Sequence, residues 1–135
     1  MKRIIACLAV TIGATAAQCA TVGVHLGTAH FGQYGKTMSS ENPGIYIEDG
    51  GYTAGIYRNS YSKPSTYAGY TGRWASGMLS LTAGVVTGYP RAVISPLLVP
   101  SIRIGVGGMF ARLAYLPKPH SHGASGVHLS IERDF

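Results

Sequence analysis

Three polar residues near the end of the sequence have the types and spacing of a serine-activating group. His128, Ser130 and Glu132 stand at every second position, which places them on one face of an extended strand. A base, a hydroxyl nucleophile and an orienting carboxylate are the parts that activate serine for acyl transfer. The sequence therefore allows a hydrolase or acyltransferase with His128, Ser130 and Glu132 as catalytic residues.

The same glutamate has a structural alternative. An isolated buried charge is costly, so a polar face turned to the protein interior would need paired ions. The charged residues that fall inside predicted strands would then form one network, or bind an anionic head group: Glu48, Arg58, Arg103, Arg112 and Glu132. A structural network is the favoured interpretation.

Signals for metals and cofactors are weak. His120 and His122 are two residues apart and could share a metal, but no acidic or thiol partner is near, and a solvated loop is the favoured interpretation. Gly105, Gly107 and Gly108 fit no phosphate-binding spacing and indicate a turn. No nucleotide, haem or zinc signature is present, so we expect no cofactor.

The stretch that carries His128 and Ser130 has the pattern of a β-strand. Residues 127–135 alternate apolar and polar side chains, and the chain ends on Phe135. This ending resembles the closing strand of bacterial outer-membrane β-barrels, although Arg133 replaces the apolar residue usual two places before the end. The His-x-Ser motif is similar to that of outer-membrane lipid A deacylases, which are also small eight-stranded barrels. In that family, however, the carboxylate lies farther along the chain than Glu132 does here. The family's catalytic groups also face lipid, whereas His128 and Ser130 lie opposite the apolar face of their strand.

The first 20 residues have the features of a signal peptide. Met1–Arg3 is basic, Ile4–Ile12 is apolar, and Ala14–Ala17 offers a small-residue cleavage site. Removing this segment takes two of the eleven basic residues and leaves nine against five acidic ones, a net charge of +4. Of the two cysteines, Cys7 and Cys19, at most Cys19 would remain, so no internal disulfide is expected. A lipoprotein in which Cys19 is lipidated is a minor alternative.

The rest of the chain predicts a single all-β domain, residues 21–135. Nineteen glycines argue against long helices, and short alternating runs recur between turn residues. We predict an antiparallel up-and-down barrel of about eight strands, at 21–31, 43–48, 52–61, 65–74, 78–87, 97–105, 109–116 and 127–135. In the first strand, Val22, Val24, Leu26 and Thr28 should share a face. Pro100 predicts a bulge or an edge in the sixth.

Alternation alone leaves the direction of the apolar face open. A soluble barrel buries its apolar face, whereas a membrane barrel turns it to lipid and packs polar groups inside. Charged residues make up only 12% of the chain, against about 25% in an average soluble domain, which favours the membrane. A girdle of aromatic residues at the interfaces points the same way: Tyr46, Tyr52, Tyr57, Tyr61, Tyr67, Tyr70, Trp74 and Tyr115. Several predicted strands are shorter than the ~9–11 residues that span a bilayer, which favours the soluble alternative.

The central segment Gly51–Trp74, with Asn42–Gly44 before it and Val86–Tyr89 after it, resembles a group of short signal-bearing proteins from proteobacteria and their phages. That resemblance implies no activity. If the protein is phage-derived, altering the host surface is one hypothesis.

Together these patterns predict a small outer-membrane β-barrel with a structural or surface-recognition role in the cell envelope. Recognition would use the predicted loops 32–42, 88–96 and 117–126. A lipid A hydrolase or acyltransferase is one alternative, and a soluble periplasmic barrel that binds a small ligand or a partner protein is another. The expected partners are outer-membrane lipid or lipopolysaccharide and an envelope protein, because the cations are dispersed rather than clustered for nucleic acid. An eight-stranded barrel is filled by its own side chains, so no transport pore is expected.

Overall fold

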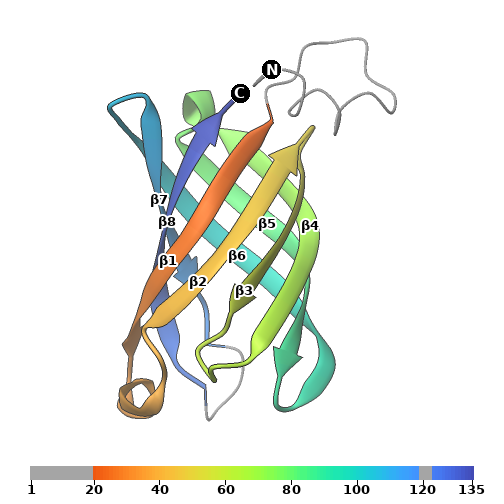
Figure 1. Cartoon of the computed structure of the whole chain (residues 1–135), viewed down its shortest axis with the longest axis vertical. Coiled ribbons are helices and arrows are strands. Elements are labelled where there is room, and N and C mark those ends of the chain that lie inside the picture. Colours follow the sequence, from red (N-terminus) through yellow and green to blue (C-terminus); the bar gives the residue numbers. More distant parts are fainter. Residues whose placement is uncertain (1–19, 119–122) are drawn as a thin grey trace.

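The chain folds into a closed barrel of eight antiparallel strands, each paired with its neighbours in sequence order. The computed structural model describes residues 20–118 and 123–135. The predicted signal peptide therefore lies almost wholly outside the described residues. Figure 1 shows the strands tilted around the barrel, with both ends of the described chain at the same rim. The strands are β1 (Thr21–Phe31), β2 (Glu41–Asp49), β3 (Tyr52–Arg58), β4 (Pro64–Trp74), β5 (Leu79–Tyr89), β6 (Ala92–Val106), β7 (Met109–Leu116) and β8 (Ser125–Asp134).

The barrel closes where β1 meets β8. Thr21 pairs with Asp134, and the register continues to Phe31 opposite Ser125. At the rim, the backbone N–H of Phe135 donates to the carbonyl of Ala20 at 2.9 Å. The predicted all-β class, the antiparallel order and the number of strands are confirmed.

The connections differ between the two rims. At the rim that holds the termini, short turns follow Asp49 and Val106, and a 3-10 helix (Ala75–Gly77) joins β4 to β5. The opposite rim carries the longer connections β1–β2, β3–β4 and β7–β8, the first of which contains a 3-10 helix (Gln33–Thr37). We call these the terminal rim and the loop rim.

Several predicted boundaries on the loop rim are wrong. The expected loop 88–96 is a tight turn at Pro90 and Arg91, because β5 continues to Tyr89 and β6 begins at Ala92. The third strand ends at Arg58 rather than at residue 61. The second begins at Glu41, two residues inside the expected first loop. Glycine, serine and proline suggested loops at 32–42 and 88–96, whereas residues 59–61 were expected to extend the third strand. In each case strand pairing in the closed barrel decides where the strand ends.

A bulge in β1 corrects one predicted face. The register with both neighbouring strands shifts between His25 and Gly27, and relative to β8 Leu26 is the extra residue. An extra residue inverts the alternation beyond it. Thr28 is therefore buried inside the barrel instead of sharing the exposed face of Val22 and Val24. Pro100 introduces no bulge, since β6 stays in register with β5 through it.

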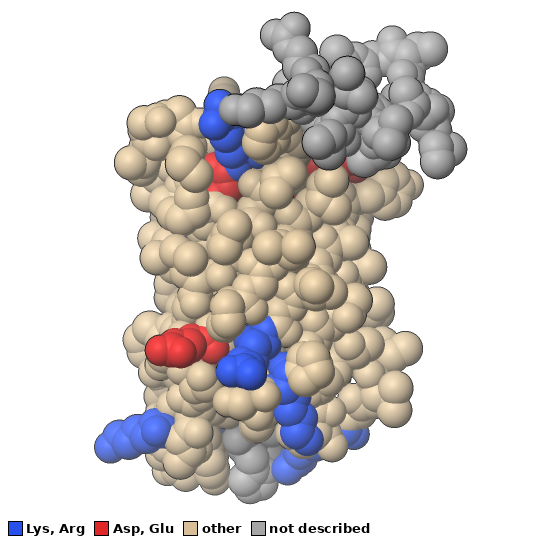
Figure 2. Space-filling view, in the orientation of Figure 1, with Lys and Arg blue, Asp and Glu red and all other residues tan. Residues whose placement is uncertain are grey.

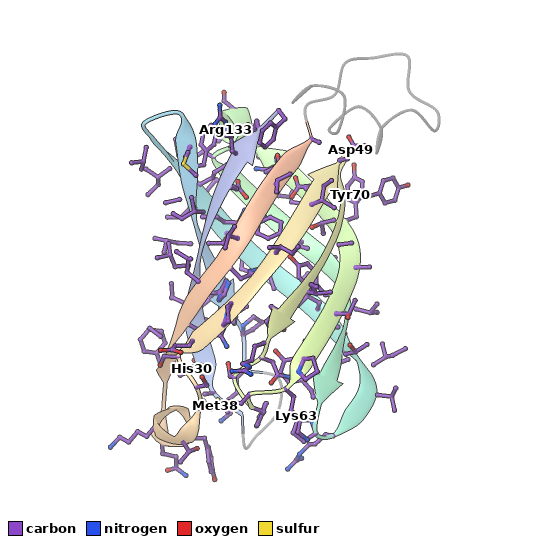
Figure 3. All side chains as sticks on the ribbon, viewed as in Figure 1. His30, Met38, Asp49, Lys63, Tyr70 and Arg133 are labelled. Atoms are coloured by element: carbon purple, nitrogen blue, oxygen red, sulfur yellow. The ribbon has the colours of Figure 1, made fainter. Side chains whose placement is uncertain are left out.

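The apolar face of the strands points outward. Leu129 on β8 is 37% exposed, and its polar neighbours His128 and Ser130 are buried. In Figure 3 many side chains project outward from the ribbon on both sides of the barrel. Large exposed apolar side chains on this outer belt come from every strand, with Val24, Ile45, Ile56, Tyr70, Val85, Leu98, Tyr115 and Leu129 as examples.

The expected aromatic girdle is only partly outside. Tyr46, Tyr57 and Tyr67 occupy inward positions, so their assignment to a girdle is wrong. Tyr52, Tyr70, Trp74 and Tyr115 are exposed, and the rings of Tyr52 and Tyr70 contact edge to face at 5.6 Å between centroids.

Candidate functional site

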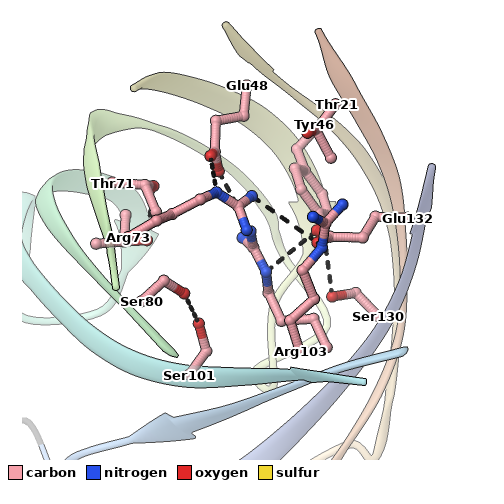
Figure 4. Close-up of polar contacts among 12 residues, drawn as sticks. Thr21, Tyr46, Glu48, Thr71, Arg73, Ser80, Ser101, Arg103, Ser130 and Glu132 are labelled. Carbon is pink, nitrogen blue, oxygen red and sulfur yellow. Dashed lines mark hydrogen bonds and ion pairs between the residues drawn. The ribbon is translucent and has the colours of Figure 1, made fainter. Parts of the chain in front are cut away.

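The half of the interior nearer the terminal rim is filled by charged side chains from five strands. Their residues occupy inward-facing positions of β2, β4, β6, β7 and β8, where alternation turns them away from the outer belt. Figure 4 shows the contacts among most of them. We call this group the charged plug: Glu48, Arg73, Arg103, Arg112, Glu132 and Asp134.

Glu132 lies at the centre of the charged plug and is 1% exposed. One carboxylate oxygen, Oε2, lies 3.1 Å from Nε of Arg112. The other, Oε1, pairs with Nε of Arg103 and lies 3.8 Å from Nη2 of Arg73. Three arginines on three different strands therefore converge on one glutamate, which ties β4, β6 and β7 to β8.

Each arginine also has a second carboxylate. Glu48 Oε1 is 2.8 Å from Nε of Arg73, and its Oε2 is 3.3 Å from Nη2 of Arg112. Arg103 pairs with Asp134 near the terminal rim. Three cations thus face three anions, and the charged plug has no net charge. Such pairing is what a buried ionic cluster requires.

Tyr46 joins the charged plug to the serine of the predicted catalytic group. Its ring lies over Gly23, where an added Cβ would be 2.0 Å from Tyr46 Cζ. In this position the hydroxyl of Tyr46 donates to Oε2 of Glu132 and lies 3.3 Å from Oγ of Ser130. The absence of a side chain at Gly23 therefore lets the tyrosine reach across β1, from β2 to β8.

A chain of hydrogen bonds lies deeper in the barrel and contains two histidines. The ring nitrogens of His128 lie 2.8 Å from Oγ1 of Thr28 and 2.8 Å from Nδ1 of His25. The other nitrogen of His25 is 3.0 Å from the hydroxyl of Tyr67. The bulge in β1 makes this chain possible, because it turns both His25 and Thr28 inward. We call these four residues the histidine chain.

The three predicted catalytic residues all line the interior, but each has other partners. Both nitrogens of His128 are engaged within the histidine chain. Ser130 contacts Tyr46, and Glu132 contacts the arginines. Among the described residues, no hydrogen bond joins His128 to Ser130, so the structure does not bring these residues together as a connected triad.

The structure assembles the predicted ionic network, except that one arginine of the predicted group is absent from it and another arginine is present instead. Glu48, Arg103, Arg112 and Glu132 meet in the charged plug, but Arg58 lies exposed at the end of β3 and makes no ion pair with a described residue. Arg73 takes its place, although it was not predicted. The alternation contained both signals, because Arg58 has the parity of the exposed Ile56 and Arg73 has that of the buried Thr71.

The half of the interior nearer the loop rim is more apolar and is not filled. A cavity of about 90 Å³ is bordered by His25, Tyr67 and His128. A second cavity, of about 420 Å³, opens at the loop rim. Inward-facing apolar side chains from β5, β6 and β7 border it: Val86, Leu97, Val99 and Leu116. His30 also borders it, with Nε2 2.7 Å from Oγ of Ser60.

The described residues contain no group of three or more histidine, cysteine, aspartate or glutamate side chains that could hold a metal ion. The candidate metal pair His120 and His122 lies outside the described residues. None of the helices in the described ranges is both long enough and apolar enough to span a membrane.

Comparison with known proteins adds no assignment to this geometry. No protein-family model matches the chain, and a search of curated proteins finds no significant match.

Proposed function

We propose that this protein is a small outer-membrane β-barrel that acts in the cell envelope by structure or by surface recognition. The observation that carries the proposal is the direction of the two strand faces. The outside is an apolar belt, and half of the inside is a neutral cluster of ions, most of them shielded from solvent. A barrel dissolved in water gains stability by the opposite arrangement, with apolar residues inside, whereas lipid favours this one.

The distribution of charge over the surface supports a membrane orientation. On the face shown in Figure 2, charged residues gather at the two rims and leave an uncharged band between them. Of the nine Lys and Arg residues after residue 20, three belong to the charged plug and one, Arg133, lies at the terminal rim. The remaining five lie at or near the loop rim: Lys36, Arg58, Lys63, Arg91 and Lys118.

This asymmetry indicates which rim faces outward in the cell. Outer-membrane barrels have short turns on the periplasmic side and longer loops outside. The loop rim would then be extracellular, where its five cations oppose a single acidic residue, Glu41. A cationic rim of this kind complements the phosphates of lipopolysaccharide. The charged plug blocks the lumen, so the proposed role is recognition or envelope structure and not conduction.

Fractionation of Gram-negative cells that express the full chain tests the location. We expect the protein in the outer-membrane fraction, with a gel mobility that changes on boiling, as closed barrels show. Release in soluble form by osmotic shock would refute the membrane assignment.

Epitope tags test the orientation. A tag inserted after Ser62, in the β3–β4 loop, should bind antibody on intact cells. The matched tag after Gly107, in the β6–β7 turn, should bind only after permeabilisation. The reverse pattern would overturn the orientation and retain the barrel.

An envelope lipid hydrolase or acyltransferase is the second candidate, and one contact favours it. His30 and Ser60 lie within hydrogen-bonding distance at the larger cavity, and a base next to a hydroxyl is the minimum for an activated serine. Mass spectrometry of lipid A would compare cells with the parent chain, with Ser60→Ala, with Ser130→Ala and with no protein. Identical lipid A profiles in all four would eliminate this candidate.

A further inference from the structure

Among the described residues, the pairing between β6 and β7 ends before the loop rim and leaves a lateral gap between these two strands. Pairing of these strands runs from Val106 opposite Met109 to Ser101 opposite Ala114 and then stops. Beyond that point β7 continues to pair with β8, as far as Leu116 opposite Gly126. Residues 92–100 of β6 therefore pair with β5 on one side and with no described residue of β7 on the other.

Two prolines lie in this unpaired part of β6. Pro96 and Pro100 have no N–H group, so neither can donate a hydrogen bond that would help close the gap. Proline within a sheet is confined largely to edge positions. The sequence of β6 thus favours an edge at this place in an otherwise closed barrel.

The larger cavity extends through this gap. Its walls include Leu97 and Val99, which face the interior, and also Pro96 and Leu98, which face outward; Leu98 is 54% exposed. Residues of both faces of β6 border this space, and they lie where the edge of β6 is unpaired with any described residue of β7. The apolar end of the interior is therefore continuous with the outer belt.

From this geometry, and from the location proposed above on which the inference rests, we propose that the cavity binds one alkyl chain of an anionic amphiphile, with a fatty acid as the simplest member, entering between β6 and β7. The residues that border the cavity are largely apolar in the interior. Arg91 and Lys118 border it at the loop rim, and none of the described residues that border it is acidic. The charges thus complement a carboxylate or phosphate above a buried chain.

The size of the cavity and its floor agree with such a ligand. Its volume of about 420 Å³ lies within the roughly 300–1,000 Å³ of small-molecule sites. Towards the terminal rim, the interior is occupied by the histidine chain and the charged plug, so a bound chain would end near His25 and His128. Its contacts would be with Val86, Leu97 and Val99, away from the surrounding bilayer lipids.

Photolabelling in zwitterionic phosphatidylcholine nanodiscs tests the proposal. The probe is a dodecanoate with a diazirine near the end of its chain. We expect saturable adducts on inward-facing residues, including Leu97 and Val99, that unlabelled dodecanoate displaces. Along an alkyl carboxylate series, each two further methylenes should strengthen competition about 15-fold until the cavity is full, when competition is plotted against the free aqueous concentration of the competitor. This step corresponds to about 0.8 kcal/mol for each methylene transferred from water.

Matched variants separate the chain site from the head-group site. Val99→Trp should fill the cavity and reduce interior labelling at least about tenfold, because overpacking excludes the ligand. Val24→Trp, on the outer face of β1, should leave labelling unchanged. Arg91→Gln with Lys118→Gln should weaken competition by dodecanoate and not by dodecanol, and Arg133→Gln should weaken neither.

Two results would overturn the proposal. One is labelling confined to outward residues such as Leu129, and the other is interior labelling that Val99→Trp does not reduce. If the proposed outer-membrane location is wrong, the protein should fail to insert into nanodiscs, and this outcome is distinct from the two above. In that case the same labelling in dodecylmaltoside micelles still decides whether the cavity holds the chain.

Discussion

Replacing Glu132 with glutamine should destabilise the folded barrel by about 3 kcal/mol. The substitution keeps the shape of the side chain but leaves Arg73, Arg103 and Arg112 facing only two carboxylates, so the charged plug acquires a net charge of +1. Removing one partner from a buried ionic group typically costs about 3–5 kcal/mol. We expect a cost at the lower end of this range, because every arginine keeps one other carboxylate partner, Glu48 or Asp134.

A second substitution tests whether the cost is electrostatic. Removing Arg112 together with Glu132 leaves two intact ion pairs, Arg73 with Glu48 and Arg103 with Asp134. The double variant Glu132→Gln with Arg112→Gln should therefore be more stable than the sum of the single changes predicts. We expect a coupling free energy of about 1–3 kcal/mol, which is within the range for contacting residues.

Urea titration of the barrel folded into lipid vesicles gives these free energies. The fraction of folded protein is measured by gel mobility without boiling. Glu41→Gln is the matched control, because Glu41 is exposed at the loop rim, and it should change the free energy by less than about 0.5 kcal/mol. A cost below about 1 kcal/mol for Glu132→Gln, or strict additivity in the double variant, would refute the account of the charged plug.

Three further substitutions test other features. Leu129→Arg, in the outer belt, should lower the free energy of unfolding in vesicles by about 2–4 kcal/mol. Val106→Arg, next to the terminal rim, should lower it by at most about 1 kcal/mol. Equal losses in urea titration would contradict a membrane-facing belt. Gly84→Ala would place a Cβ 2.1 Å from a facing backbone carbonyl oxygen and should lower the free energy of unfolding by at least about 2 kcal/mol. Gly105→Ala is the control, because no described atom beyond the adjoining residues would lie nearer than 3.7 Å to its added Cβ. Equal unfolding midpoints for the two variants would contradict close packing at Gly84. Thr28→Val removes the hydroxyl partner of a buried histidine and should cost about 1–3 kcal/mol in the same titration; an unchanged stability would show that this hydrogen bond adds nothing.

Much of the barrel could be predicted from local pattern. Alternation of side chains fixes which residues share a face within an unbroken strand, so Glu132 and Ser130 were expected together, as were Leu113 and Tyr115 opposite Arg112. The same rule could have placed Arg73 inside and Arg58 outside. Pairing partners follow in turn from eight strands in sequence order, because consecutive antiparallel strands are joined by short connections.

The candidate site depended on information that a local pattern lacks. Nothing in the sequence around Leu26 marks the bulge, which arises from pairing with β2 and β8 and decides that Thr28 meets His128. The gap beside Pro96 likewise depends on where β7 leaves β6. Both features are properties of register, and register is set by strands distant in sequence.

The sequence by itself determined that polar and apolar faces alternate along about eight strands, and that the last strand carries His128, Ser130 and Glu132 on one face. Only the tertiary structure decided that this face is the inside. Alternation is symmetric between the two sides of a sheet, so it separates the faces without orienting them. Closure of the barrel removes the symmetry, because Glu132 can meet three arginines only across the interior.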